Sequence, residues 1–208
     1  MKLNNSHIQK TVMKKIESYL YFVFGREKAT TIYYTFSFKL EELYKVSEFD
    51  SPYKANLAFI YILPIIALCR ALVNNNMIKE EAINFIRNYI FEYQKEEVEK
   101  YLKLINTPFY YSFFDRKIKK YQEKHFPMNE FNTKWVEFNN QRIYFDINRC
   151  IYMEILEEYG EEGLKQLFCE IEKNIFSKIE DKVEFTVPKK ISLGDDCCQF
   201  RFFKKDAR

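Results

Sequence analysis

The first part of the chain is patterned mainly as helices. Residues from about Ile8 to Leu20 and from Thr30 to Val46 have helical character with weak periodicity. Ser51-Pro52 punctuates the chain, and the apolar run Leu57–Cys69 that follows predicts a buried helix continuing to Val73. Three consecutive asparagines at 74–76 end that helix. We therefore expect a succession of helices before any strand.

A longer amphipathic helix is predicted next, between Met77 and Ile105. Its apolar residues recur three and four positions apart, which is the spacing of one helix face: Ile78, Ala82, Phe85, Ile86, Tyr89 and Ile90. Thr107-Pro108 breaks the pattern.

After Pro127 the pattern changes from helical spacing to alternation. The segment KWVEFNNQRIYFDI, residues 134–147, alternates polar and apolar side chains on either side of Asn139-Asn140. An asparagine pair is able to adopt positive φ, so this segment predicts a β-hairpin. A helix is expected from about Arg149 to Tyr159, where Gly160 ends it.

The last part of the chain predicts one more helix and two more strands. The helix begins near Gly163 and has an apolar stripe: Leu164, Leu167, Phe168, Ile171, Ile175 and Ile179. KVEFTVP and CCQFRFF then alternate as strands do. The predicted fold class is α+β, with N-terminal helices and then a ββ-αα-ββ arrangement whose antiparallel four-stranded sheet is covered by helices. We expect one domain over residues 1–208, mostly helical over 1–128 and carrying the ββααββ part over 129–208.

Composition and charge indicate a globular protein without a nucleic-acid partner. Of the 208 residues, 47% are hydrophobic, enough for a sizeable core. The net charge of +3 comes from 33 basic and 30 acidic residues that are interspersed along the chain. Only Asp115–His125 is locally basic, and we interpret it as a solvated helix face, because nucleic-acid binders concentrate their basic residues on one surface.

Several features predict a soluble cytoplasmic protein. The stretch Met1–Lys10 is polar and does not have the form of a signal peptide. The apolar run Leu57–Cys69 contains a proline and is shorter than the ~20 residues that cross a bilayer, so no membrane partner is expected. Five cysteines, an odd number, are expected as free thiols in a reducing compartment. The sequence does not determine the oligomeric state, and a homo-oligomer is compatible with it.

The rarity of glycine and histidine excludes several enzyme classes. The four glycines are scattered, so no Gly-rich loop exists to hold a phosphate. The two histidines, His7 and His125, have neither metal-binding spacing nor a sequence context for a Ser-His-Asp triad. We interpret His125 as a helix cap or surface residue rather than a catalytic base.

The cysteines carry the chemistry that remains. If Asn148 caps the helix after the hairpin, the thiol of Cys150 lies in its first turn beside Arg149. The helix dipole and the guanidinium would then favour thiolate and lower the pKa of Cys150. A small buried side chain without a chemical role is the alternative for this position.

Cys169 and the adjacent pair Cys197-Cys198 complete the candidate set. Cys169 and Glu172 are three residues apart on one helix face, which suits either proton transfer or a semi-buried thiol beside a surface carboxylate. Adjacent strand residues point to opposite faces, so Cys198 is expected inward with Phe200, and Cys197 outward or onto another layer. Bonding between these neighbours is not expected. As the inward-pointing thiol of the pair, Cys198 is the one able to meet Cys150 and Cys169 under the sheet. Zinc is the metal that three thiols would suit, but their long spacings lack a C-x-x-C clip, and we expect no cofactor.

Three segments are similar to a known family: LPIIALCRALVNNNMIKEEAINFI, INRCIYMEILEEYGEEGLKQLFCEIE and SLGDDCCQF. In order and spacing, from about Pro52 to Phe203, they resemble the L-2-amino-thiazoline-4-carboxylic acid hydrolase family. Four features of the family have counterparts here: a cysteine after the hairpin, a glycine that ends the next helix, a Phe-Cys pair before acidic residues, and a closing strand with a glycine, a cysteine and a phenylalanine. They correspond to Cys150, Gly160, Phe168-Cys169, and Gly194 through Cys198 to Phe200. This chain has Glu170 and Glu172 where aspartates are usual, and PKKISLG where Arg and Thr are frequent before the last strand.

The resemblance implies hydrolytic opening of a thiazoline-type cyclic amidine that bears an amino group and a carboxylate, giving a carbamoyl-cysteine-type product. Cys150 or Cys169, with Cys198 nearby, would supply a thiolate or order the water. Glu172 or Glu170 would shuttle protons. Arg149 or Lys190 would receive the substrate carboxylate. The closing motif is also similar to that of 4-vinyl-reductase-type domains, which leaves a non-catalytic small-molecule-binding or zinc-binding domain as the alternative. A structural or interaction protein is the third reading.

Overall fold

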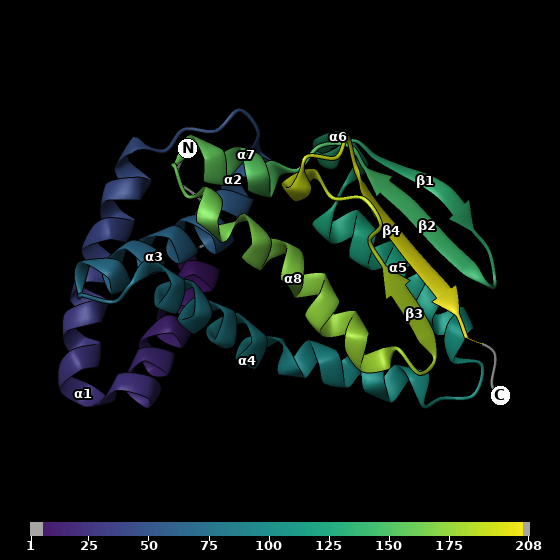
Figure 1. Ribbon diagram of the computed structural model, residues 1–208, viewed down its shortest axis with the longest axis horizontal. Helices are drawn as coiled ribbons and strands as arrows, with labels where there is room; N and C mark the ends of the chain where they lie inside the picture. The colour runs from purple at the N-terminus through teal and green to yellow at the C-terminus, as the bar shows by residue number, and fades with distance from the viewer. Residues whose placement is uncertain (1–5, 206–208) are drawn as a thin grey trace. The chain divides into compact units, whose positions relative to one another are not determined.

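The computed structural model describes residues 6–205 (Figure 1). Within them the chain divides into two compact units, one of residues up to Ile90 with Ile155–Gly163, the other of Phe91–Glu154 with the chain from Leu164 onward. The α+β class is confirmed: helices come first, then a four-stranded antiparallel sheet with helices between its strands. That the whole chain forms one domain stays a prediction. Residues 1–5 of the polar stretch predicted not to be a signal peptide lie outside the described residues.

The first unit begins with α1 (Ser6–Val46), which consists of two helical segments joined at a kink, in agreement with the two predicted helices. The helix is kinked at Gly25, whose φ of 71° and ψ of 177° leave helical geometry. Glycine adopts positive φ without the steric cost that a Cβ adds, so the break falls there. After the kink a buried stripe at spacings of three and four faces the core, formed by Ala29, Ile32, Phe36, Leu40 and Leu43. α1 packs against α3 (Leu63–Asn74).

The predicted helix after Ser51-Pro52 is present as three consecutive pieces. The Ser51 side chain accepts a hydrogen bond from the Lys54 amide and caps α2 (Pro52–Leu57). A π-helical turn, η1 (Ala58–Ile62), joins α2 to α3. In a π-turn the Phe59 carbonyl would accept from residue 64, which is proline and has no amide hydrogen. The Tyr44 hydroxyl donates to that carbonyl instead, at 2.7 Å.

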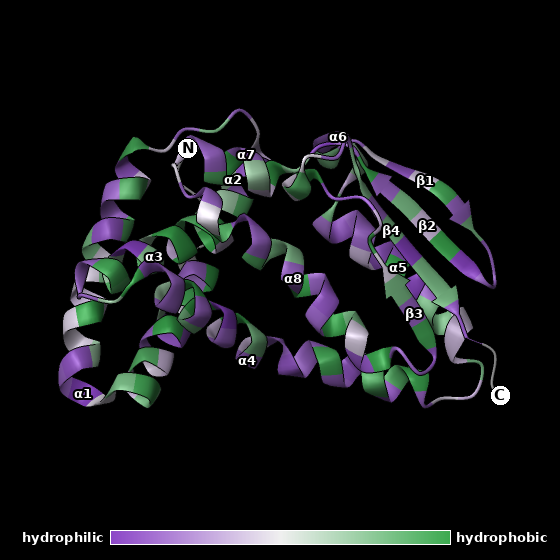
Figure 2. Cartoon of the chain, viewed as in Figure 1, coloured by the Kyte–Doolittle hydropathy of each residue, from purple (hydrophilic) through white to green (hydrophobic). Residues whose placement is uncertain are grey.

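The apolar helical run Pro52–Asn74 is a core element. Among the described residues it alone is long and apolar enough to cross a membrane, at 23 residues, whereas the sequence showed an apolar run of only thirteen. Its residues are largely hydrophobic by type (Figure 2), but 72% of its most apolar window is buried inside the protein. The core helix of a soluble protein passes the same test, and the predicted buried helix is confirmed. Asn75 caps its end, as the asparagines predicted.

Two helices pass from one unit into the other. α4 (Lys79–Ile105) begins in the first unit and continues into the second, and it ends before Thr107-Pro108 as predicted. α7 (Ile151–Glu158) begins in the second unit and ends in the first, and Gly160 follows it with a φ of 66°. A 3-10 turn, η2 (Glu162–Leu164), then leads into α8 (Lys165–Phe176).

The second unit contains the sheet and the helices that pack on it. α5 (Tyr110–His125) buries a stripe of Tyr111, Phe114, Ile118 and Gln122, while most of its basic side chains are exposed, as predicted for a solvated face. A short α6 (Met128–Phe131) precedes the first strand, and η3 (Ser177–Ile179) follows α8.

The strands are β1 (Thr133–Phe138), β2 (Arg142–Ile147), β3 (Val183–Thr186) and β4 (Cys198–Lys204), in the order β1-β2-β4-β3. The predicted hairpin is confirmed, but its turn does not use positive φ at 139–141. The Asn139 side chain accepts the amides of Gln141 and Arg142, both at 2.8 Å, and shapes the turn in this way.

Aromatic packing fixes the inner face of the sheet. Phe145 of β2 stacks on Phe200 of β4, with ring centroids 4.9 Å apart. Phe202 of β4 contacts Phe176 of α8 at 4.9 Å and Phe114 of α5 at 5.7 Å. The antiparallel register also places Ile147 opposite Cys198. This packing holds α8 and the start of β4 close together, and the candidate site lies there.

Candidate active site

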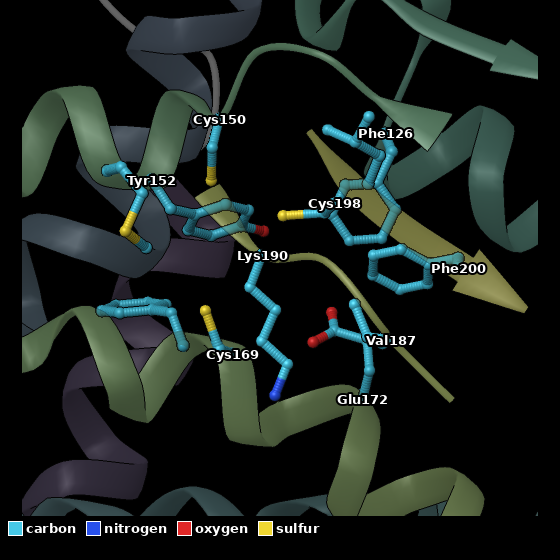
Figure 3. A pocket seen from close by; sticks show the side chains of 12 residues that line it. Phe126, Cys150, Tyr152, Cys169, Glu172, Val187, Lys190, Cys198 and Phe200 are labelled. Carbon is cyan, nitrogen blue, oxygen red and sulfur yellow. The ribbon is translucent and has the colours of Figure 1, made fainter. Parts of the chain in front are cut away.

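One small cavity of about 50 Å³ gathers most of the residues that the sequence singled out. It lies wholly in the second unit, with walls from the start of α7, α8, the start of β4 and the segment between β3 and β4 (Figure 3). Its lining residues are Phe126, Ile147, Cys150, Tyr152, Met153, Phe168, Cys169, Glu172, Val187, Lys190, Cys198 and Phe200. A mainly apolar concavity with a few polar groups is typical of small-molecule sites.

Three cysteines that are distant in sequence meet at this cavity. Cys150 precedes α7, Cys169 lies in α8 and Cys198 begins β4, and their sulfur atoms are directed into one space (Figure 3). Cys197 does not line it, although it is buried as well. All five cysteines are free thiols, so the terminal pair is not a disulfide.

Cys150 does not have the low pKa that its position at a helix start predicted. The Asn148 side chain donates to the Asn132 carbonyl at 2.8 Å, a contact outside the helix start. The amides of Tyr152 and Met153 donate to the Cys150 thiol and favour thiolate, but burial outweighs them and raises its pKa to about 12. The prediction is wrong because it counted the helix end and omitted desolvation.

Cys169 and Cys198 are held by different hydrogen bonds. The Cys169 thiol bonds the Ser192 hydroxyl, with sulfur and oxygen 3.2 Å apart. Burial raises its pKa, while Ser192 and the Lys190 ammonium act in the opposite direction. Cys198 accepts the Ile191 amide at 3.3 Å, and burial raises its pKa to about 11. Cys169 is thus the thiol beside both a hydroxyl and a cation.

Glu172 is the acidic residue that enters the cavity. Burial raises the pKa of its carboxyl group to about 7, although the Tyr121 hydroxyl donates to its Oε1 atom at 3.2 Å and favours the charged form. A carboxyl group with a pKa near neutral can both accept and release a proton. Glu170, the second acidic residue singled out in the sequence, does not line the cavity.

The two predicted cationic residues are placed differently. Lys190 lines the cavity, and its side chain crosses the space between Cys169 and Glu172 (Figure 3). Arg149 does not line it. Its guanidinium is bonded to both carboxylate oxygens of Glu154, at 2.5 and 2.8 Å. Arg149 therefore orders the approach to α7, and Lys190 is the cation within reach of a ligand.

The sequence did not indicate the residues that hydrogen-bond the cavity-lining side chains without lining the cavity themselves. Tyr121 bonds Glu172 and Ser192 bonds Cys169, yet neither was singled out. Tyr121 is three residues after the buried Ile118, a helical spacing that would have placed it near the core face. His125 also lies against it, with ring centroids 4.6 Å apart. Burial lowers the pKa of His125 to about 4, so it is neutral at physiological pH.

Within residues 6–205 no three His, Cys, Asp or Glu side chains are grouped closely enough to hold a metal ion. The thiols share a cavity without forming a ligand cluster, so this arrangement offers no support for the zinc alternative.

A family model described as L-2-amino-thiazoline-4-carboxylic acid hydrolase matches residues 58–202. The chain belongs to this hydrolase family. The matched segment begins at the π-turn, after α1 and α2, and includes every residue that lines the cavity. Cys150, Cys169 and Cys198 therefore belong to the part that this member shares with its family.

Two further comparisons add no functional detail for this thiazoline hydrolase family member. Among curated proteins no sequence matches it. The crystal structure of the Fe(II) unliganded H-NOX protein from K. algicida is similar over 96% of this chain and 97% of that chain, with 10% sequence identity and a TM-score of 0.36. A likeness this weak supports no conclusion about fold, ligand or activity.

Proposed function

We propose that this protein hydrolyses a small cyclic amidine of the 2-amino-thiazoline-4-carboxylate type to a carbamoyl-cysteine-type product, with assistance from a thiol. Membership of the hydrolase family supports the reaction class. The observation that carries the proposal is the cavity, in which three thiols, the carboxyl group of Glu172 and the ammonium of Lys190 line one space. Its activity in the cytoplasm stays a prediction.

The charges in the cavity match the charges of such a substrate. An amidine is cationic when protonated and suits the carboxylate of Glu172, while the substrate carboxylate suits the ammonium of Lys190. Among the described residues, no carboxylate lies within ion-pair distance of the Lys190 ammonium, so its charge is available for a ligand. Aromatic walls at Phe126, Phe168 and Phe200 would pack against the ring.

Cys169 is assigned as the nucleophile because of its neighbours. Glu172 is one helical turn further along α8, and Ser192 and Lys190 stabilise a thiolate. A neutral thiol is a weak nucleophile, so its proton must leave as the new bond forms. Glu172, with a pKa of about 7, is able to take that proton. Cys150 and Cys198, with pKa values of about 12 and 11, would shape the cavity wall.

The proposed steps consume one water and need no oxidant. Sγ of Cys169 bonds to the amidine carbon while its proton passes to Glu172. One bond from that carbon to a ring heteroatom then breaks, and the heteroatom keeps the electron pair and takes the proton from Glu172. Water next attacks the same carbon at its remaining carbon–nitrogen double bond, and that nitrogen takes one of the two water protons. Glu172 takes the other proton and passes it to Sγ as the bond from carbon to Sγ breaks. The thiol is restored, and the carbon becomes the carbonyl of a carbamoyl group.

Ring opening by the purified protein is the direct test. Mass spectrometry of the product should show the gain of one water, and a quenched reaction should show the covalent adduct on the peptide that carries Cys169. Single replacement of Cys150, Cys169 and Cys198 by Ala should abolish turnover only for Cys169→Ala. Full turnover by all three variants would exclude a thiol mechanism.

A non-catalytic small-molecule-binding domain is the second candidate, favoured by the raised pKa of all three thiols. Calorimetry distinguishes the two functions. Saturable binding of the cyclic amidine with no product after prolonged incubation would support the binding domain.

A further inference from the structure

We infer that Tyr121 is a positioning residue that determines which oxygen of Glu172 presents the transferable proton to the cavity. The inference rests on the proposed function in one respect, because it takes Glu172 as the acid and base of that reaction. The Tyr121 hydroxyl donates to Oε1 of Glu172 at 3.2 Å. Tyr121 does not line the cavity, whereas Glu172 does, so the tyrosine contacts the carboxyl group from the protein side.

The surroundings of Tyr121 keep its ring in one position. His125 lies against the ring at a centroid distance of 4.6 Å. Phe176 and Phe126 meet it edge to face, at 5.8 and 6.0 Å. A ring packed on several sides has little freedom to move its hydroxyl oxygen away from Glu172. Phe126 also lines the cavity, so the same packing connects the wall to the hydrogen bond.

The hydrogen bond assigns different roles to the two carboxyl oxygens. Burial and the nearby Glu172 carboxylate raise the pKa of Tyr121 well above its ordinary value, so the phenol stays protonated and remains a donor. Oε1 accepts from it and therefore acts as the carbonyl oxygen when Glu172 is neutral, because a carbonyl oxygen is the better acceptor. The proton of neutral Glu172 then belongs on Oε2. Without Tyr121, either oxygen could carry it.

Other titratable groups surround Glu172 and set the background for this bond. They come from every wall of the cavity: Cys169 on α8, Cys198 on β4, Lys190 on the segment between β3 and β4, and Cys150 and Tyr152 at α7. His125 is behind Tyr121 and is neutral. Of these described groups, Tyr121 is the one that donates a hydrogen bond to the carboxyl group itself. Its removal should therefore change Glu172 more than it changes the thiols.

The test replaces only the hydroxyl, with Tyr121→Phe. A carboxylate that loses a hydrogen-bond donor becomes harder to ionise, so the pKa of Glu172 should rise by about one unit. Carbon-13 NMR of labelled glutamate carboxyl groups measures this directly, with Glu172→Gln to assign the signal. In the assay, the limb of the pH–rate profile that reports Glu172 should move upward by the same amount, and kcat should fall about tenfold with KM little changed.

Tyr101→Phe is the matched control. The Tyr101 hydroxyl is also buried in the second unit but has no hydrogen-bond partner among the described residues. Its removal should leave both the NMR titration and the pH–rate profile unchanged. An unchanged Glu172 titration in Tyr121→Phe, or an equal shift in Tyr101→Phe, would overturn the inference.

A measurement on the wild-type chain tests the inference even if Tyr121→Phe does not fold. The chemical shift of the labelled Tyr121 phenol carbon should change with pH at the same midpoint as that of the Glu172 carboxyl carbon. That change should disappear in Glu172→Gln. Independent titration of the two groups would also overturn the inference. These NMR readouts need no turnover, so absent ring opening would defeat the proposed function while leaving the Tyr121–Glu172 pairing to be judged separately.

Discussion

Glu161 is buried in the first unit and Glu172 is half-buried at the cavity of the second unit, and their surroundings differ. Glu161, in the first unit, has a side chain only 8% exposed and forms ion pairs with Arg70 at 2.8 Å and Lys79 at 3.3 Å. Glu172, in the second unit, forms no ion pair among the described residues and accepts a hydrogen bond from neutral Tyr121. Burial raises its pKa from 4.5 to about 7.

The difference separates a carboxylate used for structure from one available for chemistry. The charge of Glu161 is neutralised by two cations, and Arg70 also donates to the Tyr159 carbonyl at 2.7 Å, which closes the network. Glu172 has no ion-pair partner among the described residues, and Lys190 shares its cavity without forming an ion pair with it, so the charged form of Glu172 bears a desolvation cost. Burial alone therefore does not indicate function, whereas a desolvated carboxyl group without an ion pair, in a cavity, is a candidate for chemistry.

The largest expected effect is on turnover. Glu172→Gln keeps the size and the acceptor for Tyr121 but cannot transfer a proton, so ring opening should fall by about 10² to 10⁴. Glu161→Gln, assayed below its unfolding temperature, should keep wild-type turnover. Steady-state measurement of product on both variants checks the contrast, and equal losses in the two would contradict it.

The second effect is on stability and has the opposite sign. Because the folded protein holds the Glu172 proton up to a pH of about 7 and the unfolded chain releases it near 4.5, the contribution of Glu172 to wild-type stability falls as pH rises between these values. Above pH 7 the cost is complete, on the order of 3 kcal/mol. Glu172→Gln removes it, so the variant should exceed the wild type by up to that amount at about pH 8 and match it at about pH 4.

Urea unfolding at both pH values measures this, and Glu161→Gln in parallel is the control. His125 has an opposite dependence, because its pKa is lowered from 6.5 to about 4 and its contribution is lost as pH falls through that range. The comparison between variant and wild type cancels the His125 term. A variant less stable than wild type at the higher pH would show that the Glu172 carboxylate is favourably solvated.

The third effect is the loss of the structural network. Glu161→Gln leaves Arg70 and Lys79 without their carboxylate, and breaking a fully buried pair costs about 3–5 kcal/mol. Both cations are partly exposed, at 35% and 48%, and can be hydrated, so we expect about 2 kcal/mol. Denaturant unfolding at neutral pH gives the value. No measurable loss would mean that Glu161 is as dispensable as a surface carboxylate.

The fold could be predicted from the sequence wherever the pattern was local. Alternation around Asn139-Asn140 and the helical spacing before Ile105 are direct consequences of side-chain direction in strands and helices. It also indicated two helical segments before Val46, which Gly25 separates. The pattern could not reveal that the turn uses the Asn139 side chain rather than positive φ.

Several residues that line the candidate cavity could be named from the sequence, but their electrostatics could not be predicted. The residues that chemistry singles out, such as Cys150 and Lys190, line one cavity. Their protonation depends on burial, which sequence does not show, and the helix-start argument for Cys150 failed for that reason. Arg149 could not be distinguished from Lys190 without seeing the bidentate bond to Glu154.

The smallest effect concerns the more exposed partner of the structural glutamate. Lys79→Met removes an ammonium that is 48% exposed and 3.3 Å from Glu161, so it should cost less than about 1 kcal/mol. Arg70→Met should cost more, because that guanidinium also bonds the Tyr159 carbonyl. Unfolding in low and high salt separates the two: the Lys79 effect should shrink with added salt, since an exposed ion pair is screened, and the Arg70 effect should persist. Equal costs of Lys79→Met and Arg70→Met at high salt would contradict this order and would mean that Glu161 needs both cations. A single nearby cation, such as Lys190 in the cavity of Glu172, would then neutralise a desolvated carboxylate only partly.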